Sequence, residues 1–236
     1  STLISFGFLS QLREPEGEVL SAVSRSTRQF WRGLGDILRR DGNFRMFIGA
    51  RLLAQAASVG TAFFTVYAVR HFALDAGTAG VMTGVLLIAQ LLTNPVFGWL
   101  GDRSSHRFTF AIGVLLAGGS AVVALFAPSL EWFYLVFALA GFANAGLTPS
   151  IYALIAEFGT LAERPYYIGL ANTLVAPATL LAPIIGGWLA DAVSYQATFG
   201  AAAITSILAA GIILLIREPR AHYAEPMAVV VPVEIS

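Results

Sequence analysis

Among the uncharged polar side chains that interrupt long apolar runs in this sequence, eight are candidates to hydrogen-bond a small solute. Amides supply donors and acceptors together, and hydroxyls supply one donor and two acceptor lone pairs. The candidate binding residues are Gln55, Ser58, Gln90, Asn94, Asn144, Thr148, Tyr152 and Asn172. Residues 144, 148 and 152 lie at i, i+4 and i+8, so they would share one face of a helix. Such a face points to a cavity, where it could bind a solute, or to a neighbouring helix, which it would bridge by hydrogen bonds.

Two charged residues lie near the ends of the apolar runs. Arg51 lies about two turns into the first run, and Glu157 ends the fourth. We expect the two charges to form an ion pair, although Arg51 could instead extend to lipid headgroups. No ionisable residue lies near the middle of any run. A coupling proton, if the protein uses one, would therefore bind to a carboxylate outside this chain's spans.

Other kinds of chemistry are excluded by the residue types. The chain has 236 residues, no cysteine and three histidines, and all 14 of its basic residues are arginine. Thiol catalysis, cysteine-based metal sites and lysine-dependent phosphate binding are therefore excluded. No G-x-S-x-G or H-E-x-x-H motif is present. We expect no catalytic residue, no metal, no cofactor and no nucleic-acid partner.

The elements that position these residues are membrane-spanning helices. The chain is 57% hydrophobic and only 12% charged, whereas soluble domains are about 25% charged. A bilayer core about 30 Å thick requires roughly 20 apolar residues in a helix. The six runs that satisfy this length are 45–70, 78–101, 108–127, 132–157, 167–190 and 197–216. The short gaps between them predict an all-α membrane protein in which neighbouring helices run antiparallel.

The arginines predict the orientation. If residues 1–44 are cytoplasmic, twelve of the 14 arginines lie on the cytoplasmic side, while Arg70 lies outside and Arg51 lies within a span. Arginine is enriched in cytoplasmic loops. The pattern predicts a multi-pass protein of the plasma membrane, specifically a bacterial inner membrane, with both terminal segments in the cytoplasm.

The flanking segments suggest an internal duplication. Residues 1–12 are apolar and precede Arg-Glu-Pro at 13–15, and the sixth run precedes the same three residues at 217–219. The recurrence could also arise by chance. A stretch at 27–40 has the spacing of an amphipathic helix lying on the cytoplasmic membrane face, although it could be a solvated linker. We expect four segments: the end of a preceding transmembrane helix (1–12), a cytoplasmic linker with an amphipathic helix (13–44), a six-helix transmembrane domain (45–220) and a cytoplasmic tail (221–236).

The loop after the second run carries a motif. It reads Gly98-Trp-Leu-Gly-Asp-Arg-Ser-Ser-His-Arg107, which resembles the G-x-L-A-D-R-x-G-R-K motif of the major facilitator superfamily. This sequence departs from the motif at Gly101, Ser105 and His106. The resemblance implies a conformational latch in which Asp102 meets a helix of another six-helix half, in the outward-open state. The residues assigned to it are Gly98, Asp102, Arg103 and Arg107. Alternatively, the charges only anchor the loop in the cytoplasm.

A second stretch resembles a helix motif of the same superfamily, G-x8-G-x3-G-P-x2-G-G. Its small residues permit close helix contact, and its proline bends the helix. The helix-packing residues expected here are Gly169, Pro183, Gly186 and Gly187, with Ala178 and Ala182 in place of two glycines.

The resemblance implies a six-helix bundle that is the C-terminal half of a twelve-helix transporter. A half that begins with a long leader is the alternative. The implied function is secondary active transport of an unknown small molecule by alternating access, with the lipid bilayer and the other half as partners. The lack of charge in mid-membrane favours neutral or amphipathic solutes, as in drug-type efflux. A non-transporting scaffold or receptor of the same fold is the competing interpretation.

Overall fold

The computed structural model describes residues 35–73, 75–160 and 163–217. The segments expected at 1–12 and 221–236, and most of the linker expected at 13–44, lie outside these ranges. The chain divides into two units, Ser1–Arg39 and Arg40–Ser236. In the first unit, residues 35–39 are helical, which is the described part of the amphipathic helix expected at 27–40. The following paragraphs describe the second unit.

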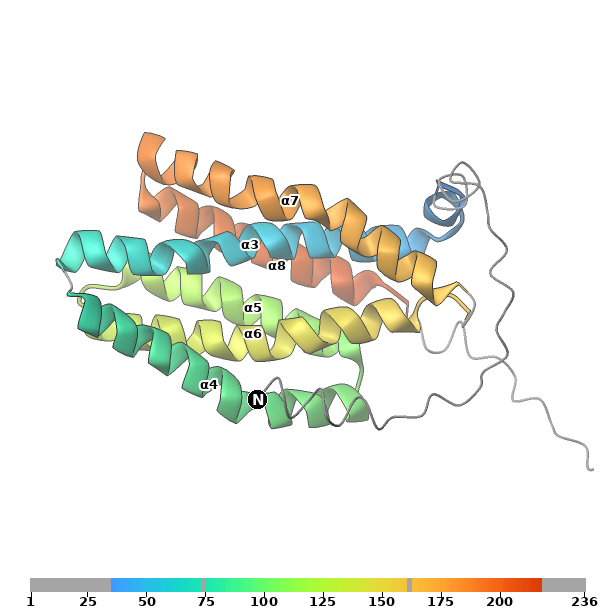
Figure 1. The fold of residues 1–236 in the computed structure, drawn as a ribbon, viewed down its shortest axis with the longest axis horizontal. Coiled ribbons are helices and arrows are strands. Elements are labelled where there is room, and N and C mark those ends of the chain that lie inside the picture. Colours follow the sequence, from blue (N-terminus) through green and yellow to red (C-terminus); the bar gives the residue numbers. More distant parts are fainter. Residues whose placement is uncertain (1–34, 74, 161–162, 218–236) are drawn as a thin grey trace, which may run out of the picture. The chain divides into compact units, whose positions relative to one another are not determined.

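Six long helices form this unit (Figure 1). Each is long and apolar enough to cross a membrane, which confirms the predicted all-α, six-span fold class. The side chains of Asp41, Asp75, Ser105 and Ser194 cap four of the helices by accepting hydrogen bonds from first-turn backbone N–H groups. The helices are α3 (Gly42–Phe72), α4 (Ala76–Arg103), α5 (His106–Phe126), α6 (Glu131–Glu157), α7 (Arg164–Ala192) and α8 (Tyr195–Leu215).

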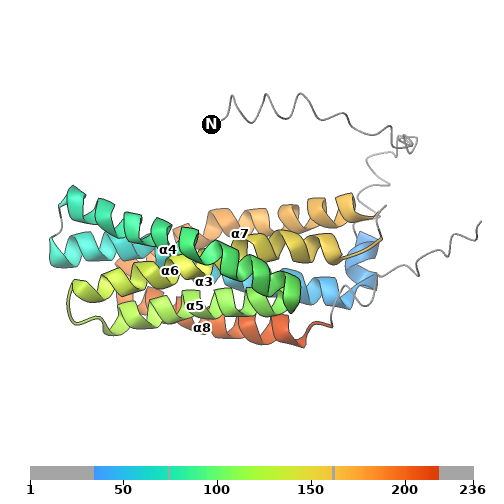
Figure 2. The ribbon, with the colours of Figure 1, turned by 90° about the horizontal axis from the view of Figure 1, so that it is seen from below.

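The helices form two layers. Helices α4 and α7 lie at opposite edges of the bundle in Figure 1, and Figure 2 shows both on the side away from α8. Helix α4 packs on α6, and α7 packs mainly on α3. Helices α5 and α8 pack on each other and on α3, and α5 also packs on α6. The front layer therefore runs α4, α6, α3, α7, with α5 and α8 behind it.

Glycines allow the closest helix crossings. A β-carbon added at Gly113 of α5 would lie 2.9 Å from the Leu147 nitrogen of α6, and one at Gly118 would lie 2.6 Å from the Ser206 β-carbon of α8. At Gly141 of α6 an added β-carbon would collide with the Leu86 carbonyl oxygen of α4. Helices in lipid associate through such close packing, because water drives no hydrophobic association there.

Alternating direction brings the starts of α3, α5 and α7 together with the ends of α4, α6 and α8. Hydrogen bonds join these helix ends: Arg107 donates to the Ile216 carbonyl, and Asn43 exchanges two hydrogen bonds with the Arg217 backbone at 3.0 and 3.2 Å. We call this end of the bundle the basic end. Its described residues are 40–45, 102–107, 157–160, 163–164 and 216–217.

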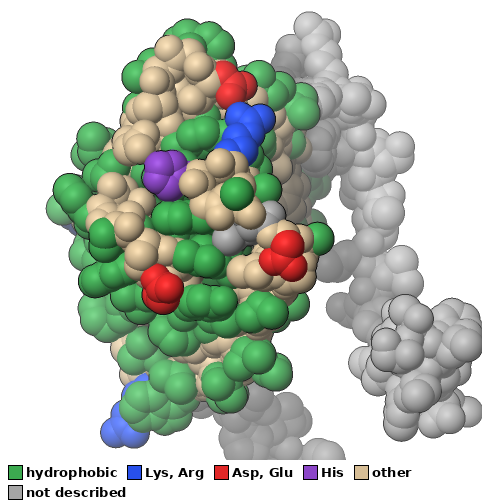
Figure 3. Space-filling model, turned by 90° about the vertical axis from the view of Figure 1, so that its left-hand side faces the viewer, with side chains coloured by type: hydrophobic (Ala, Val, Ile, Leu, Met, Phe, Trp, Pro, Cys, Tyr) green, Lys and Arg blue, Asp and Glu red, His purple; other side chains and the backbone are tan. Residues whose placement is uncertain are grey.

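The opposite end has few charges. Arg70 donates to the Tyr195 hydroxyl at 2.8 Å and lies 3.7 Å from Asp191. Figure 3 faces this end and shows a few charged side chains among many hydrophobic ones. Behind it lies an aromatic core in which Tyr67 stacks on Phe133 and meets Phe199 edge to face. This core holds α3, α6 and α8 together.

Candidate functional site

A polar recess lies between α3 and α7 in the front layer. Its volume is about 430 Å³, and we call it the α3/α7 recess. Its lining residues are Arg51, Asn172, Val175, Ala176, Thr179 and Leu180. The residues from α7 fall at i, i+3, i+4, i+7 and i+8, which is one face of that helix. The recess thus combines one cation and two uncharged polar side chains with an apolar wall.

Arg51 dominates the chemistry of this recess. Its Nη2 donates to the Asn172 amide oxygen at 3.2 Å, and Tyr152 of α6 interacts with it electrostatically. Its Nη1 is buried and has no hydrogen-bond partner within the described part of the chain. A buried donor left without a partner costs free energy. An acceptor that reached this nitrogen would therefore be stabilised.

The structure does not form the expected ion pair between Arg51 and Glu157. Arg51 bonds to Asn172 instead, and Glu157 Oε1 lies 3.8 Å from His106 Nε2. Depth explains the difference. Arg51 is nine residues beyond the start of α3, or about 14 Å at 1.5 Å per residue, whereas Glu157 is the last residue of α6.

The other expected binding residues lie on helices of the front layer and differ in how far their side chains are buried. Gln55 follows Arg51 by one turn on the same face of α3 and is half-buried, whereas the Ser58 hydroxyl donates back to the Ala54 carbonyl. On α6, residue 144 is half-buried and residues 148 and 152 are exposed. On α4, Gln90 is half-buried near the close crossing at Gly141, and Asn94 is exposed. Of the expected binding residues, Asn172 and Tyr152 are the ones that interact with Arg51.

A second, apolar cavity of about 400 Å³ lies on another side of α7. It opens between α3, α7 and α8, and its walls include Ala56, Ala182 and Thr205. The α7 residues that line it are offset around the helix from those of the α3/α7 recess. Helix α7 therefore has open space on two sides.

The residues of the expected latch lie at the end of α4. Asp102 is exposed, and the Arg103 guanidinium lies 5.4 Å from the centre of the Trp99 ring. Arg107, in the first turn of α5, bonds to the Ile216 carbonyl and so connects the loop to the end of α8. Gly98 is exposed, and open space surrounds the position of a β-carbon there.

The motif's departures from the family pattern have a structural reason that sequence reasoning missed. A β-carbon at Gly101 would lie 2.7 Å from Nδ1 of His106, so an alanine here would require this ring to shift. His106 in turn approaches Glu157, and both side chains are largely buried, at 16% and 10% exposure. The sequence contained a signal for this contact, because both positions depart from the family motif within the same loop: Gly101 replaces alanine and His106 replaces arginine.

The helix-packing residues of α7 differ among themselves. A β-carbon at Gly186 would collide with Val59 of α3, whereas Gly187 has only ordinary contacts with Phe63. Gly169 is exposed, and the described residues leave open space around it. The expectation of helix packing therefore fits Gly186 and not Gly169 within this bundle. Pro183 lies exposed inside α7.

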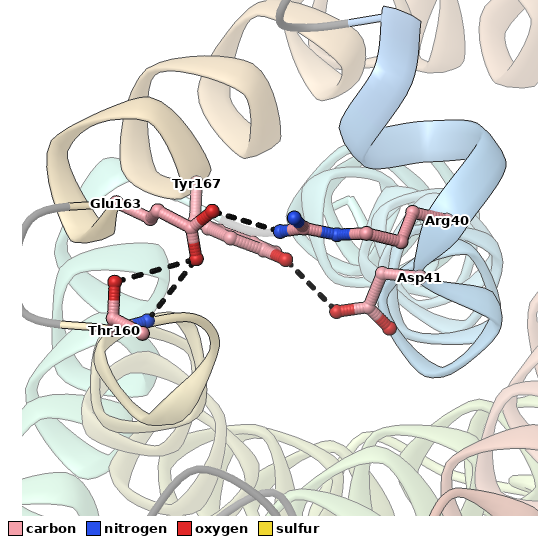
Figure 4. Close-up of polar contacts among 5 residues, drawn as sticks. All are labelled: Arg40, Asp41, Thr160, Glu163 and Tyr167. Carbon is pink, nitrogen blue, oxygen red and sulfur yellow. Dashed lines mark hydrogen bonds and ion pairs between the residues drawn. The ribbon is translucent and has the colours of Figure 1, made fainter. Parts of the chain in front are cut away.

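A cluster of polar contacts joins the start of α3 to the start of α7 (Figure 4). Arg40 Nη2 donates to Glu163 Oε1 at 2.8 Å, and the buried Tyr167 hydroxyl donates to Asp41 at 3.0 Å. Glu163 also accepts from the Thr160 backbone at 3.3 Å. The hydrogen bond from Arg40 lowers the pKa of the Glu163 carboxyl below its ordinary value, and the same bond raises the pKa of Arg40. We call these five residues the clasp.

The loop beside the clasp depends on one glycine. Gly159 has a φ of +72°, and a β-carbon there would lie 2.5 Å from the Tyr167 ring. Tyr167 also stacks on Phe158, with ring centroids 6.1 Å apart. Tyr167 of the clasp is therefore packed closely against Phe158 and Gly159. Within the described ranges, no group of three or more His, Cys, Asp or Glu side chains could hold a metal ion.

Comparison with known proteins adds three relatives. The chain is 31% identical over 144 residues to Multidrug resistance protein 1 of Bacillus subtilis, which covers 61% of this chain and 37% of that protein. It is 30% identical over 141 residues to the vesicular acetylcholine transporter of Mus musculus, covering 59% and 27%. It is 23% identical over 152 residues to Quinolone resistance protein NorA of Staphylococcus aureus, covering 64% and 39%. The matched part of the chain thus spans less than two fifths of these relatives.

A family profile extends the match to most of the chain. The profile of the Major Facilitator Superfamily aligns with residues 43–232, a range that includes the six long helices except for Gly42, the first residue of α3. The six apolar helices and the loop motif at the end of α4 agree with this assignment. The chain belongs to the Major Facilitator Superfamily.

Proposed function

We propose that the protein is a secondary active transporter that moves a small solute across the membrane by alternating access. The observation that carries this proposal is the α3/α7 recess, a partly polar and open depression in the front layer of a membrane bundle of this superfamily. Transporters of such folds bind their solutes near the middle of the membrane, between two repeats. Two of the three relatives described are named for resistance to drugs or quinolones, which supports efflux of drug-like molecules.

The six helices would act as the C-terminal half of a twelve-helix protein. Helices α4 and α7 each expose large apolar side chains, such as Leu91 and Leu92 on α4 and Ile184 and Trp188 on α7. These two helices also have the smallest buried shares of the six spans. Both lie at the edges of the front layer, where a second six-helix half would cover them.

Alternating access requires a contact that is made in one state and broken in the other. Asp102 is the candidate, because it is exposed at the end of α4 and would meet the other half at the cytoplasmic face. The basic end would lie in the cytoplasm, since arginines gather there. In a bacterium, the membrane would be the inner membrane.

The test is efflux of a fluorescent quinolone by the complete protein reconstituted in liposomes, with and without a proton gradient. The wild-type protein should transport the quinolone, and Asp102→Asn should slow transport at least tenfold while insertion and thermal stability stay unchanged. Asp191→Asn removes an exposed carboxylate at the opposite end and is the matched control. Binding without transport in the wild type would favour a receptor or scaffold and contradict the proposal. Full transport by Asp102→Asn would contradict the latch.

A further inference from the structure

We propose that the α3/α7 recess binds the carboxylate of an amphipathic organic acid through Arg51. The inference rests on the proposed function, because it names the class of solute that this site would take. Organic acids and zwitterions with a free carboxylate would be preferred over neutral analogues of the same shape. This differs from the neutral or apolar solutes that the absence of charge in mid-membrane suggests.

The recess lies at membrane depth. Arg51 and Asn172 lie nine and eight residues from the starts of parallel helices, α3 and α7, which places both about 12 to 14 Å along those helices. The lining continues to Leu180, sixteen residues into α7, or about 24 Å along it. The recess therefore extends from the level of Arg51 toward the opposite side of the membrane.

The charge at the recess has no counter-ion in the described part of the chain. Arginine stays protonated at all physiological pH values, and none of the ion pairs formed by the described residues includes Arg51. Asn172 is neutral and accepts one of its five N–H groups. An uncompensated cation inside a membrane is costly, so such residues mark binding sites or transport paths.

The free donor of Arg51 fits a carboxylate. Nη1 is buried beside the recess and has no acceptor among the described residues. A guanidinium presents parallel N–H groups that match the two oxygens of a carboxylate. The remaining N–H of the Asn172 amide could donate to the same oxygens. A solute would thus replace the missing acceptor and supply the missing negative charge.

The rest of the lining fits an apolar body. Val175, Ala176 and Leu180 present hydrocarbon, and the Thr179 hydroxyl already donates to the Val175 carbonyl at 3.3 Å. The recess therefore offers polar partners at the Arg51 end and apolar contact beyond it. Ligand sites commonly combine a few polar groups with such a wall.

The binding test uses two isosteric probes, radiolabelled 2-naphthoate and 2-naphthamide, which differ in charge but not in ring system. The complete protein is placed in phosphatidylcholine nanodiscs, and dissociation constants are measured by equilibrium dialysis. Wild type should bind the acid at least tenfold more tightly than the amide. Arg51→Gln should weaken acid binding at least tenfold and amide binding less than twofold, while Arg51→Lys should retain part of the preference.

Two controls protect the interpretation. Arg70→Gln removes an arginine from the opposite end and should leave both dissociation constants unchanged. Asn172→Ala should weaken acid binding even if Arg51→Gln proves unstable, because it removes the neighbouring amide.

Repeating the assay in phosphatidylglycerol tests whether a lipid phosphate takes the place of the carboxylate. Strong loss of naphthoate binding in that lipid, in wild type alone, would assign the site to headgroups and overturn the proposal.

The proposal is also overturned if wild type binds the two probes equally, binds neither, or keeps its preference for the acid in Arg51→Gln. These outcomes are independent of the transport test. Loss of acid binding in Arg51→Gln without quinolone efflux by wild type would support the carboxylate site and contradict transport. Quinolone efflux by a wild type that shows no preference for the acid would support transport and contradict the carboxylate site.

Discussion

The crossing of α4 and α6 makes a quantitative prediction for Gly141→Ala. The added methyl would lie 2.9 Å from the Ala89 β-carbon and would also collide with the Leu86 carbonyl oxygen. Carbon atoms pack best at about 3.5 to 4.0 Å, so the helices must separate locally by about 0.6 Å or more. Overpacking of this kind costs about 1–3 kcal/mol, and the helix preference of alanine returns about 0.5–1 kcal/mol. We expect a net loss of about 0–2.5 kcal/mol in the free energy of unfolding.

The measurement is reversible unfolding of the complete protein in mixed micelles, followed by tryptophan fluorescence. The matched control is Gly84→Ala on α4, where nothing lies within 4 Å of an added β-carbon. The control should be neutral or stabilising by up to about 1 kcal/mol. If Gly141→Ala proves as stable as Gly84→Ala, the close approach of α4 and α6 is refuted.

Two further predictions concern the clasp. The pKa of Glu163 is lowered in the folded protein, so its contribution to stability is complete above the ordinary value of 4.5 and is lost as the pH falls through the lower folded value. Glu163→Gln should therefore be less stable than wild type at pH 7, and the difference in melting temperature should shrink below pH 4.5; a constant difference would exclude the ion pair with Arg40 as the cause. Gly159→Ala should destabilise the protein by at least about 1–2 kcal/mol in the same unfolding assay, because the backbone at this position has a positive φ and the added methyl would meet the Tyr167 ring. If the variant has wild-type stability, the described turn is contradicted.

The sequence predicted the helices well, because their apolar length and, in four of them, the capping side chain are local properties of each segment. The first run was predicted at 45–70 and the helix spans Gly42–Phe72, and the fourth was predicted at 132–157 and spans Glu131–Glu157. Hydrophobic length sets the span, and side chains such as Asp41 and Asp75 fix where the helices begin. The number of spans, their direction and the family all follow from information local to each segment.

The contacts of the site could not be predicted in the same way. Arg51 and Glu157 lie toward the same side of the membrane by sequence, but the depth and the rotation of each helix decide which side chains meet. These depend on crossings such as that of Gly186 with Val59. Asn172 was recognised as a polar residue of a span, and its hydrogen bond to Arg51 required the packing of α7 on α3.

Because Gly101 and His106 lie so close together, the side chain tolerated at either position of the loop motif depends on the residue at the other. A methyl at position 101 would lie only 2.7 Å from the imidazole of His106, so that ring would have to move to admit the methyl. Their substitutions are therefore expected to be strongly non-additive. Alanine at position 101 is therefore expected to be tolerated better when a smaller side chain replaces His106 than when the imidazole ring is kept.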